Sequence, residues 1–177
     1  MHQQHKLSHQ DAMRVVEVIR AELEQQGKGA AIAVADAHGE LLAFLRTDGC
    51  KLPSIQIAIN KAFTAAREQK PSRAVGDSSR DHQWPMTNFG DLRYTAWGGG
   101  VPLVYAGQVV GGVGLGVHRH LPILAVEDSA PHGAAFADEV VGRVAEQVDQ
   151  GIVACHDVSA VAHVEKILGA QAAAGSH

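Results

Sequence analysis

The first half of the chain alternates between apolar stripes and polar turns in an order that predicts helix, hairpin and helix. The first helix is expected to begin after Ser8, which suits a helix cap, with Asp11 three residues later reaching back to it. Gly27 and Gly29 are expected to end this helix. Its apolar stripe has the spacing of one helix face and consists of Ala12, Val15, Val16, Ile19 and Leu23.

Two pairs of short apolar segments predict two β-hairpins. The first joins residues 30–35 to residues 40–46, around a turn in which Gly39 supplies the positive φ that a short loop favours. The second joins residues 101–105 to residues 108–117. The return strand of the second hairpin is rich in glycine, which indicates a bulge or close approach by another backbone or a ligand. These glycines are Gly111, Gly112, Gly114 and Gly116.

A second helix is expected between the hairpins, from Pro53 to about Gln69. Proline suits a first helical position because its missing N–H would be unpaired there anyway, and Pro71 marks the end of the helix. On a helical wheel the core face holds Ile55, Ala58, Ile59, Ala62, Phe63 and Ala66. The opposite stripe holds Ile57, Lys61, Thr64 and Glu68.

Residues 71–100 are expected to be mainly loop. The chain has two Trp, two Tyr and four Phe, and half of these aromatic residues fall here: Trp84, Phe89, Tyr94 and Trp97. A segment of this length is typical of a binding loop, in which aromatics line a cleft and polar contacts come from Arg73, Arg80, His82 and Arg93. The alternative is a lid whose aromatics cover the open side of the core or pack at a subunit interface.

Residues 118–177 form a tail with two further expected helices, over about 134–150 and 158–168. His118 and His120 lie at the start of this tail, on one face of a strand end, with a spacing that metal sites use. The alternative is a pair of surface or interface histidines, because a metal site needs a third ligand, from His82, His132 or His156.

Composition and charge place the chain among globular proteins and narrow its partners. With 177 residues, 46% hydrophobic and 19% charged, we expect one domain over residues 1–177. The net charge of −4 and the lack of a basic block argue against nucleic-acid or anionic-membrane binding. No apolar run approaches the roughly 18 residues of a membrane span, and two cysteines are too few for a disulfide framework. We therefore expect a cytoplasmic protein.

Arg46, Asp48 and Lys61 are the leading candidates for ligand binding. The Asp48–Gly49 turn lies just before the second helix, whose N-terminal amides favour anions. If this turn and the polar helix face meet at a cleft, Arg46 and Lys61 present two cations to a carboxylate, a group found in haem, other tetrapyrroles and small organic acids. The alternative is a structural pair, Arg46–Asp48 or Lys61–Glu68. The full candidate set is Arg46, Asp48, Lys61, Thr64, Trp84 and Trp97.

Several segments share the pattern of one known family. They are LSHQDA (7–12), IAVAD with Gly39, LAFLRTDG (42–49), SIQIAINKAFTA (54–65), and GGVPL with GQVVG (99–111). Together, from about residue 7 to 117, they resemble the GlcG/HbpS-like family, often described as haem-degrading or haem-binding. The C-terminal domain of the PduO adenosyltransferases belongs to the same family.

The resemblance implies a profilin-like α+β fold, in which helices flank an antiparallel sheet of about five strands, and this chain adds a C-terminal helical tail. It also implies a homo-oligomer, a dimer or higher, that binds a small ligand, haem or another tetrapyrrole in the relatives. The chain departs from the family pattern in the tail, residues 118–177, and in the loop 76–97. Since no axial ligand follows from the family motif, His82, His118 and His120 are candidates on their chemistry alone.

Three functions follow from these features. The first is a cytoplasmic small-ligand-binding protein of the haem-binding type. The second is a catabolic lyase or isomerase of an aromatic or small carboxylic acid, such as an aromatic hydroxylamino acid. In this enzyme Arg46 and Lys61 hold the carboxylate, and His82, Tyr94 or His118 transfers protons. The third is a non-catalytic oligomeric accessory protein, in which the aromatic loop is interface.

Overall fold

The computed structural model describes residues 5–117, 138, 141–143 and 145 of the chain. The elements follow one another in nearly the order that the hydrophobic pattern predicts. Their bounds are α1 (His9–Gln25), β1 (Ala30–Asp36), β2 (Leu41–Arg46), α2 (Pro53–Glu68), α3 (Ser72–Asp81), the short 3-10 helix η1 (Met86–Phe89), β3 (Gly100–Tyr105) and β4 (Gln108–Val117).

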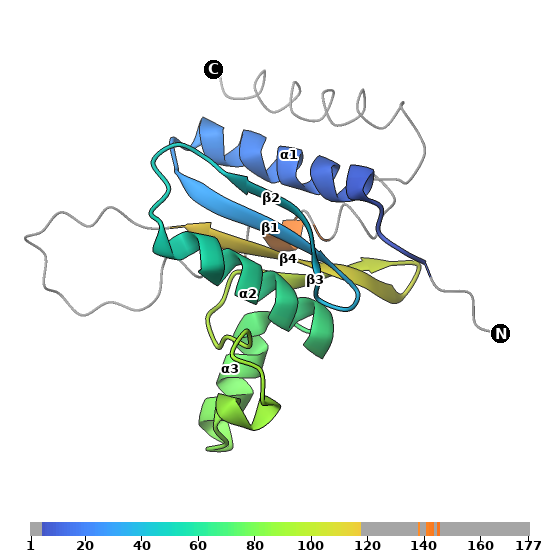
Figure 1. Cartoon of the computed structure of the whole chain (residues 1–177), viewed down its shortest axis with the longest axis vertical. Coiled ribbons are helices and arrows are strands. Elements are labelled where there is room, and N and C mark those ends of the chain that lie inside the picture. Colours follow the sequence, from blue (N-terminus) through green and yellow to red (C-terminus); the bar gives the residue numbers. More distant parts are fainter. Residues whose placement is uncertain (1–4, 118–137, 139–140, 144, 146–177) are drawn as a thin grey trace, which may run out of the picture.

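The four strands form one antiparallel sheet in the order β2-β1-β4-β3. Helix α1 covers one face of this sheet and α2 covers the other, while α3 projects away from α2 (Figure 1). The expected α+β architecture of a sheet flanked by helices is confirmed. The described part of the chain contributes four strands to the sheet, where about five were expected.

Helix α1 begins at the predicted cap and packs its apolar stripe on the sheet. The Ser8 hydroxyl accepts a hydrogen bond from the Asp11 amide at 3.1 Å, and the Asp11 carboxylate accepts one from the Ser8 amide at 3.2 Å. After the helix, Gly27 adopts a φ of 61° and the Lys28 amide donates to the Leu23 carbonyl at 3.0 Å. The predicted stripe is buried in one cluster with sheet residues such as Ile32, Val34, Val113 and Leu115.

Helix α2 lies directly on the glycine-rich strand β4. A Cβ atom added at three glycines of β4 would come within 2.5 Å of a helix carbonyl oxygen, with Gly116 facing Ser54, Gly114 facing Ala58 and Gly112 facing Ala62. The contacts repeat because four helical residues and two strand residues both span about 6 Å. Of the predicted alternatives for these glycines, close approach by another backbone is therefore confirmed.

Helix α3 occupies part of the segment that was expected to be loop. Its sequence, SRAVGDSSRD, offers few apolar positions and has a glycine at its centre, so the pattern shows no helical stripe. Tertiary contacts hold it instead. Val75 is fully buried, a Cβ at Gly76 would lie 2.2 Å from the Ala96 carbonyl oxygen, and the Ser72 hydroxyl donates to the Trp97 carbonyl at 2.7 Å. Helix α3 is thus fixed by the segment that leads into β3.

The predicted polar stripe of α2 is wrong at two positions. Lys61 is only 6% exposed and Thr64 is fully buried. The Thr95 amide donates to the Thr64 hydroxyl at 3.0 Å, and a Cβ at Gly100 would lie 2.5 Å from the Lys61 carbonyl oxygen. Helix α2 therefore has two buried sides, one against the sheet and one against residues 94–100, whereas the helical wheel assumes a single core face.

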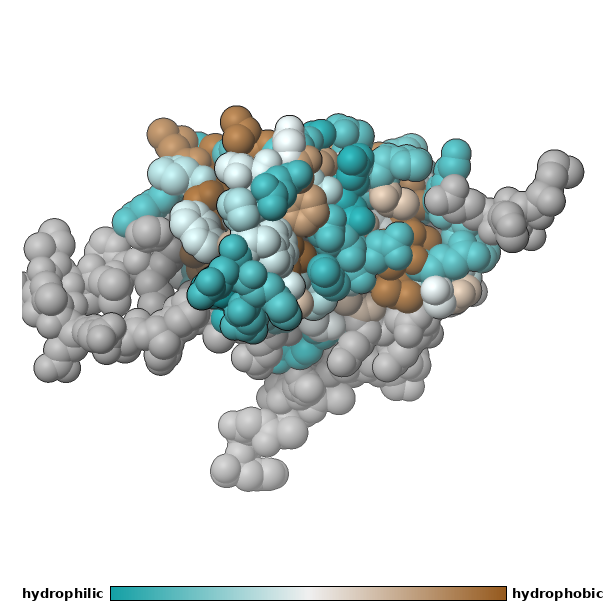
Figure 2. Space-filling view, turned by 90° about the horizontal axis from the view of Figure 1, so that it is seen from below, coloured by the Kyte–Doolittle hydropathy of each residue, from teal (hydrophilic) through white to brown (hydrophobic). Residues whose placement is uncertain are grey.

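From the α3 end, the visible surface of the described residues is mainly hydrophilic, with apolar residues in small separate groups (Figure 2). The large apolar side chains exposed in the described residues are Met13, Leu41, Leu52, Leu92 and Trp97. None of the helices in the described part of the chain combines the length and apolarity needed to cross a membrane. The two expected tail helices lie outside the described residues, except for five helical positions, Asp138, 141–143 and Ala145.

Candidate functional site

Lys61 is the most deeply buried of the candidate ligand-binding charges. Its ammonium donates a hydrogen bond to the carbonyl oxygen of Leu115, in β4, at 2.9 Å. The Leu115 amide donates on the same side of β4 to the Gly99 carbonyl at 2.8 Å. The side chain of Lys61 therefore reaches to the side of β4 that faces the start of β3.

Lys61 takes part in an interruption of the β3–β4 ladder. Residues directly opposite in an antiparallel pair can exchange two hydrogen bonds, and Gly99 and Leu115 exchange only one. The Gly99 amide donates instead to the carboxylate of Asp138, while the Leu115 carbonyl accepts from Lys61. An ammonium and a carboxylate thus replace the missing bond, and both charges are brought to the same end of the sheet.

Arg73, from α3, is the second cation at this position. Its Nε lies 2.6 Å from Oδ2 of Asp138. The pair lies directly over Gly98, where a Cβ would be 2.6 Å from Asp138 Oδ2 and 3.0 Å from Arg73 Nη2. The side chains of Arg73 and Asp138 are 35% and 27% exposed, so solvent reaches this pair, whereas Lys61 is buried. We use the name carboxylate site for Arg73, Gly98 and Gly99, which lie against the Asp138 carboxylate, together with Lys61, whose charge interacts with it.

The charges in the carboxylate site act on one another. Burial lowers the pKa of Lys61 from 10.5 to about 8, the Asp138 carboxylate opposes this change, and the Arg73 guanidinium adds to it. At neutral pH the lysine is therefore mainly an ammonium, with a larger neutral fraction than an exposed lysine. Such a group can bind a carboxylate as a cation and can also exchange a proton near neutral pH.

Hydrogen bonds from Ser72 fix the glycine segment of the carboxylate site. The Ser72 hydroxyl donates to the Trp97 carbonyl at 2.7 Å and accepts from the Gly100 amide at 3.0 Å. Trp97 itself is 60% exposed, and its amide donates to the Thr95 hydroxyl at 3.4 Å. Three of the candidate residues therefore meet on one side of α2. Lys61 and Thr64 lie on the helix, and Trp97 belongs to the segment 94–100 that packs against it.

The candidate residues Trp84 and Tyr94 belong to a row of aromatic rings. Tyr94 stacks on Phe89 with ring centroids 3.9 Å apart, and it meets Phe63 of α2 edge to face at 5.1 Å. Phe89 meets Trp84 edge to face at 5.5 Å. The row runs from the buried Phe63 outwards through the loop, an arrangement that fits the alternative of aromatics covering the core.

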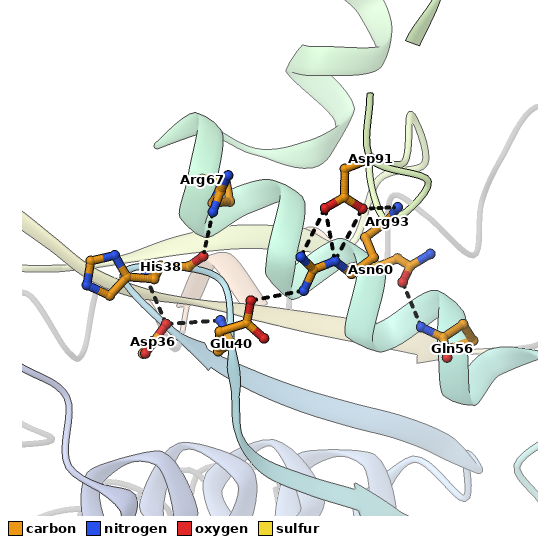
Figure 3. A network of polar contacts seen from close by, with 8 residues as sticks. All are labelled: Asp36, His38, Glu40, Gln56, Asn60, Arg67, Asp91 and Arg93. Carbon is orange, nitrogen blue, oxygen red and sulfur yellow. Dashed lines mark hydrogen bonds and ion pairs between the residues drawn. The ribbon is translucent and has the colours of Figure 1, made fainter. Parts of the chain in front are cut away.

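Arg93 ties this aromatic row to the first hairpin. Its guanidinium lies 4.0 Å from the centroid of the Phe63 ring, and it bonds the carboxylates of Asp91 and Glu40, the latter at 3.1 Å. Figure 3 shows the ion pairs of Arg93 with Asp91 of the loop and Glu40 of the β1–β2 turn, and the contact with Phe63 adds α2. Glu40 is placed by Asp36, whose carboxylate accepts from the Glu40 amide at 3.0 Å. The contacts of Arg93 therefore hold the loop against α2 and the first hairpin, which indicates a structural role for this residue.

Arg46 and Asp48 lie elsewhere. Arg46 is exposed at the end of β2, opposite Ala31 of β1, and Asp48 is exposed in the following turn. Strands β1 and β4 separate Arg46 from the side of β4 that Lys61 reaches, so the structure does not bring these two cations together within one chain. The described structure also shows neither an Arg46–Asp48 nor a Lys61–Glu68 ion pair; Glu68 lies 4.0 Å from Lys70.

The histidine candidates fall in two groups. His82 is exposed at the end of α3, with Nδ1 3.0 Å from the Ser78 carbonyl oxygen. His118 and His120 lie outside the described residues. Within the described ranges, no group of three or more His, Cys, Asp or Glu side chains is placed to hold a metal ion.

Sequence reasoning missed part of the carboxylate site. In the sequence, Arg73 is only one of several basic residues of the expected loop, and Asp138 has no motif that marks it. The glycine run 98–100 was the available signal, because consecutive glycines before a strand allow close approach by side chains. The partnership of Arg73 with Asp138, 65 residues away, has no local pattern that reveals it.

Comparisons with known proteins agree with the fold. Protein GlcG of Escherichia coli (strain K12) is 32% identical to the chain over 109 residues, which is 62% of this chain and 80% of GlcG. A double mutant of HbpS from Streptomyces reticuli superposes with a TM-score of 0.64 at 24% identity, covering 84% of this chain and 90% of HbpS. The PduOC:heme complex has a TM-score of 0.66 at 17% identity, covering 80% of this chain and 94% of that one.

The two solved structures are less than 25% identical to the chain, so they show a shared fold. A family model decides the membership. The model described as "Haem degrading protein HbpS-like" matches residues 7–118, which is more than half of the chain. These residues include every described element from α1 to β4, and so all four strands of the sheet. The chain belongs to the HbpS-like family.

Proposed function

We propose that the chain is a cytoplasmic small-ligand-binding protein of the HbpS type, and that it recognises a carboxylate of its ligand. The observation that carries this proposal is the carboxylate site, where a guanidinium and a backbone amide bind a carboxylate and a buried ammonium lies close enough to interact with its charge. Proteins use these groups to bind carboxylates. The family description and the haem complex of the structural relative PduOC support a ligand of the haem type.

The described residues fit one part of haem. The two propionates of haem are carboxylates. Arg73 and the Gly99 amide would hold one of them as they hold Asp138, and the charge of Lys61 would attract it. Iron is usually bound by His, Cys, Met or Tyr. None of the described residues that contact the Arg73–Asp138 pair is of these types. We therefore assign the propionate contact to the carboxylate site and assign no axial ligand.

A haem titration of the purified apo-protein tests this function. We expect a saturable Soret band near one haem per chain. We also expect Lys61→Met to weaken binding by at least about tenfold, or about 1.4 kcal/mol, because it removes the buried positive charge that attracts the carboxylate. Lys70→Met is the matched control, because Lys70 is an exposed lysine just after α2 and should leave the affinity unchanged.

Two results would contradict the proposal. One is the absence of a saturable Soret band together with no binding of simpler carboxylates. The other is equal haem affinity of the wild type and Lys61→Met, which would place the ligand away from the carboxylate site.

The pKa of Lys61, about 8, favours a second candidate function, a lyase or isomerase of a small carboxylic acid. A lysine that titrates near neutral pH can act as a general acid or base. Turnover of an aromatic or small carboxylic acid that is lost in Lys61→Met and retained in Lys70→Met would support this activity. A catalytic rate unaffected by Lys61→Met would exclude Lys61 from it.

Assembly into a homo-oligomer is the third element of the proposal. Strands β2 and β3 are the edges of the sheet in the described chain, and Trp97 is 60% exposed beside β3. Unpaired strand edges and exposed aromatic side chains are features of subunit interfaces. Sedimentation velocity of the wild type and Trp97→Ala tests this point, and we expect a smaller species for the variant. A wild-type monomer would contradict it.

A further inference from the structure

Asp138 places a carboxylate of the chain itself in the carboxylate site. Its Oδ2 lies 2.6 Å from Arg73 Nε, and its Oδ1 accepts a hydrogen bond from the Gly99 amide. The Lys61 ammonium is close enough for the two charges to interact. Both carboxylate oxygens are thus bound, which is the arrangement that a ligand carboxylate would adopt with the same groups.

The site and its occupant come from different parts of the chain. Lys61, Arg73 and Gly99 lie within residues 7–118, the part that matches the family model, and Asp138 lies beyond it. The tail segment therefore supplies an anion to a site that the family-like part of the chain builds.

The segment that carries Asp138 is attached independently of Arg73. Val141, about one helical turn later, is fully buried in the core on the α1 face. Arg143 Nη2 lies 2.7 Å from Glu22 Oε1 on α1. Because these contacts hold the segment, the Asp138 side chain can rotate away from Arg73 without release of the segment. The Arg73–Asp138 pair is also about one-third exposed, so a ligand can reach it from solvent.

We propose that Asp138 is a tethered competitor of the ligand. Its carboxylate and the ligand carboxylate bind the same guanidinium and amide, so only one of them is bound at a time. This inference rests on the proposed function and adds regulation of the same site by the tail. The apparent Kd for a carboxylate equals the intrinsic Kd divided by the fraction of molecules from which Asp138 has departed. Removal of the Asp138 charge should therefore tighten ligand binding.

The test uses the full-length protein, benzoate as the probe and the Gly99 amide proton resonance as the reporter. In Asp138→Asn the side chain keeps its size and loses its charge, so we expect this resonance to move upfield. Benzoate should return it downfield, with a Kd at least about tenfold lower than in the wild type, as expected if Asp138 is bound in at least about 90% of molecules. Benzamide, which has the same ring and no charge, should leave the resonance unchanged.

Matched variants separate competition from a general charge effect. Asp138→Glu keeps a carboxylate on the same segment, so its Kd for benzoate should stay close to the wild-type value. Asp81→Asn removes an exposed carboxylate at the end of α3 and should also leave the Kd unchanged. Asp138→Ser is titrated in parallel with Asp138→Asn, so that the result does not depend on the folding of one variant.

The outcomes distinguish this inference from the proposed function. If the wild type and both neutral variants bind benzoate equally, and Lys61→Met loses binding, then the competitor role is overturned and the proposed function stands. If benzoate leaves the Gly99 resonance unchanged in every protein, both are overturned. Tighter binding in Asp138→Asn or Asp138→Ser, without tightening in Asp138→Glu or Asp81→Asn, supports the tethered competitor.

Discussion

The ammonium of Lys61 lies 2.9 Å from the carbonyl oxygen of Leu115 and takes the place of the Gly99 amide in the β3–β4 ladder. A backbone acceptor in the sheet is thus satisfied by a buried charge. Keeping this charge away from water costs free energy, because burial favours the neutral amine. The free energy of unfolding should therefore change with pH as Lys61 titrates.

The first prediction concerns this pH dependence. The pKa of Lys61 is about 8 in the folded chain and 10.5 in the reference state, so the unfolded chain binds more protons between these values. Stability must then rise with pH over this range, by about 3 kcal/mol if Lys61 acts alone. Urea unfolding of the wild type and Lys61→Met, measured from pH 7 to pH 10.5, gives the difference. A difference that stays constant with pH would show that Lys61 titrates normally.

A second prediction concerns Gly114, where a Cβ would lie 2.1 Å from the Ala58 carbonyl oxygen. Gly114→Ala must push α2 off the sheet, and we expect it to destabilise the fold by about 3 kcal/mol. Gly142→Ala is the control, because Gly142 is helical and, outside its own helix backbone and chain neighbours, no atom of the described residues lies within 4 Å of an added Cβ. This control should be neutral or stabilise the protein by up to about 1 kcal/mol. Equal urea midpoints for the two variants would refute the close contact.

The cap of α1 gives a third prediction. Ser8→Ala removes the hydroxyl that accepts from the Asp11 amide, and should cost about 1 kcal/mol, or about 2–4 °C in Tm. Ser8→Asp keeps a capping oxygen and should recover most of this loss. Thermal unfolding followed by circular dichroism measures both variants. A Tm of Ser8→Ala equal to that of the wild type would mean that the cap does not stabilise the helix.

A fourth prediction concerns the Arg93 contacts. Lysine keeps the charge of Arg93 but cannot lie flat on Phe63 and bond two carboxylates at once. Arg93→Lys should therefore lower the urea midpoint of unfolding. Arg80→Lys is the matched control, since Arg80 forms an exposed ion pair with Asp77 of the same helix, and such pairs contribute little. If the two variants have the same stability in urea, the stacking on Phe63 does not contribute.

The sequence predicts well the elements that local rules decide. Helix α1 follows from a cap and one stripe, and both hairpins follow from apolar segments around glycine turns. These local rules fail to predict the burial of Lys61. A helical wheel assigns one core face, and α2 has a second buried side because residues 94–100 pack on it. A charged residue at such a position cannot be told from a solvent-exposed one by periodicity.

The candidate site was predictable only in part, for a related reason. Lys61 is among the predicted ligand-binding residues, and its expected partner, Arg46, lies across two strands from it. The actual neighbours are Arg73 on α3, a helix with almost no apolar pattern, and Asp138, 39 residues after Gly99. Contacts of this kind depend on how distant segments meet, and a single sequence contains no local signal of them.

The glycine face of β4 also determines which parts of the protein can move. Where α2 touches this strand, the strand contributes no side chain that could change rotamer and absorb a displacement. Helix α2 and the sheet must therefore move together as one rigid unit. Opening of the carboxylate site then requires movement of α3 and of the segment 82–99. Amide hydrogen exchange should be slowest along β4 and α2. A ligand should alter the exchange of α3 and leave that of α2 and the sheet unchanged.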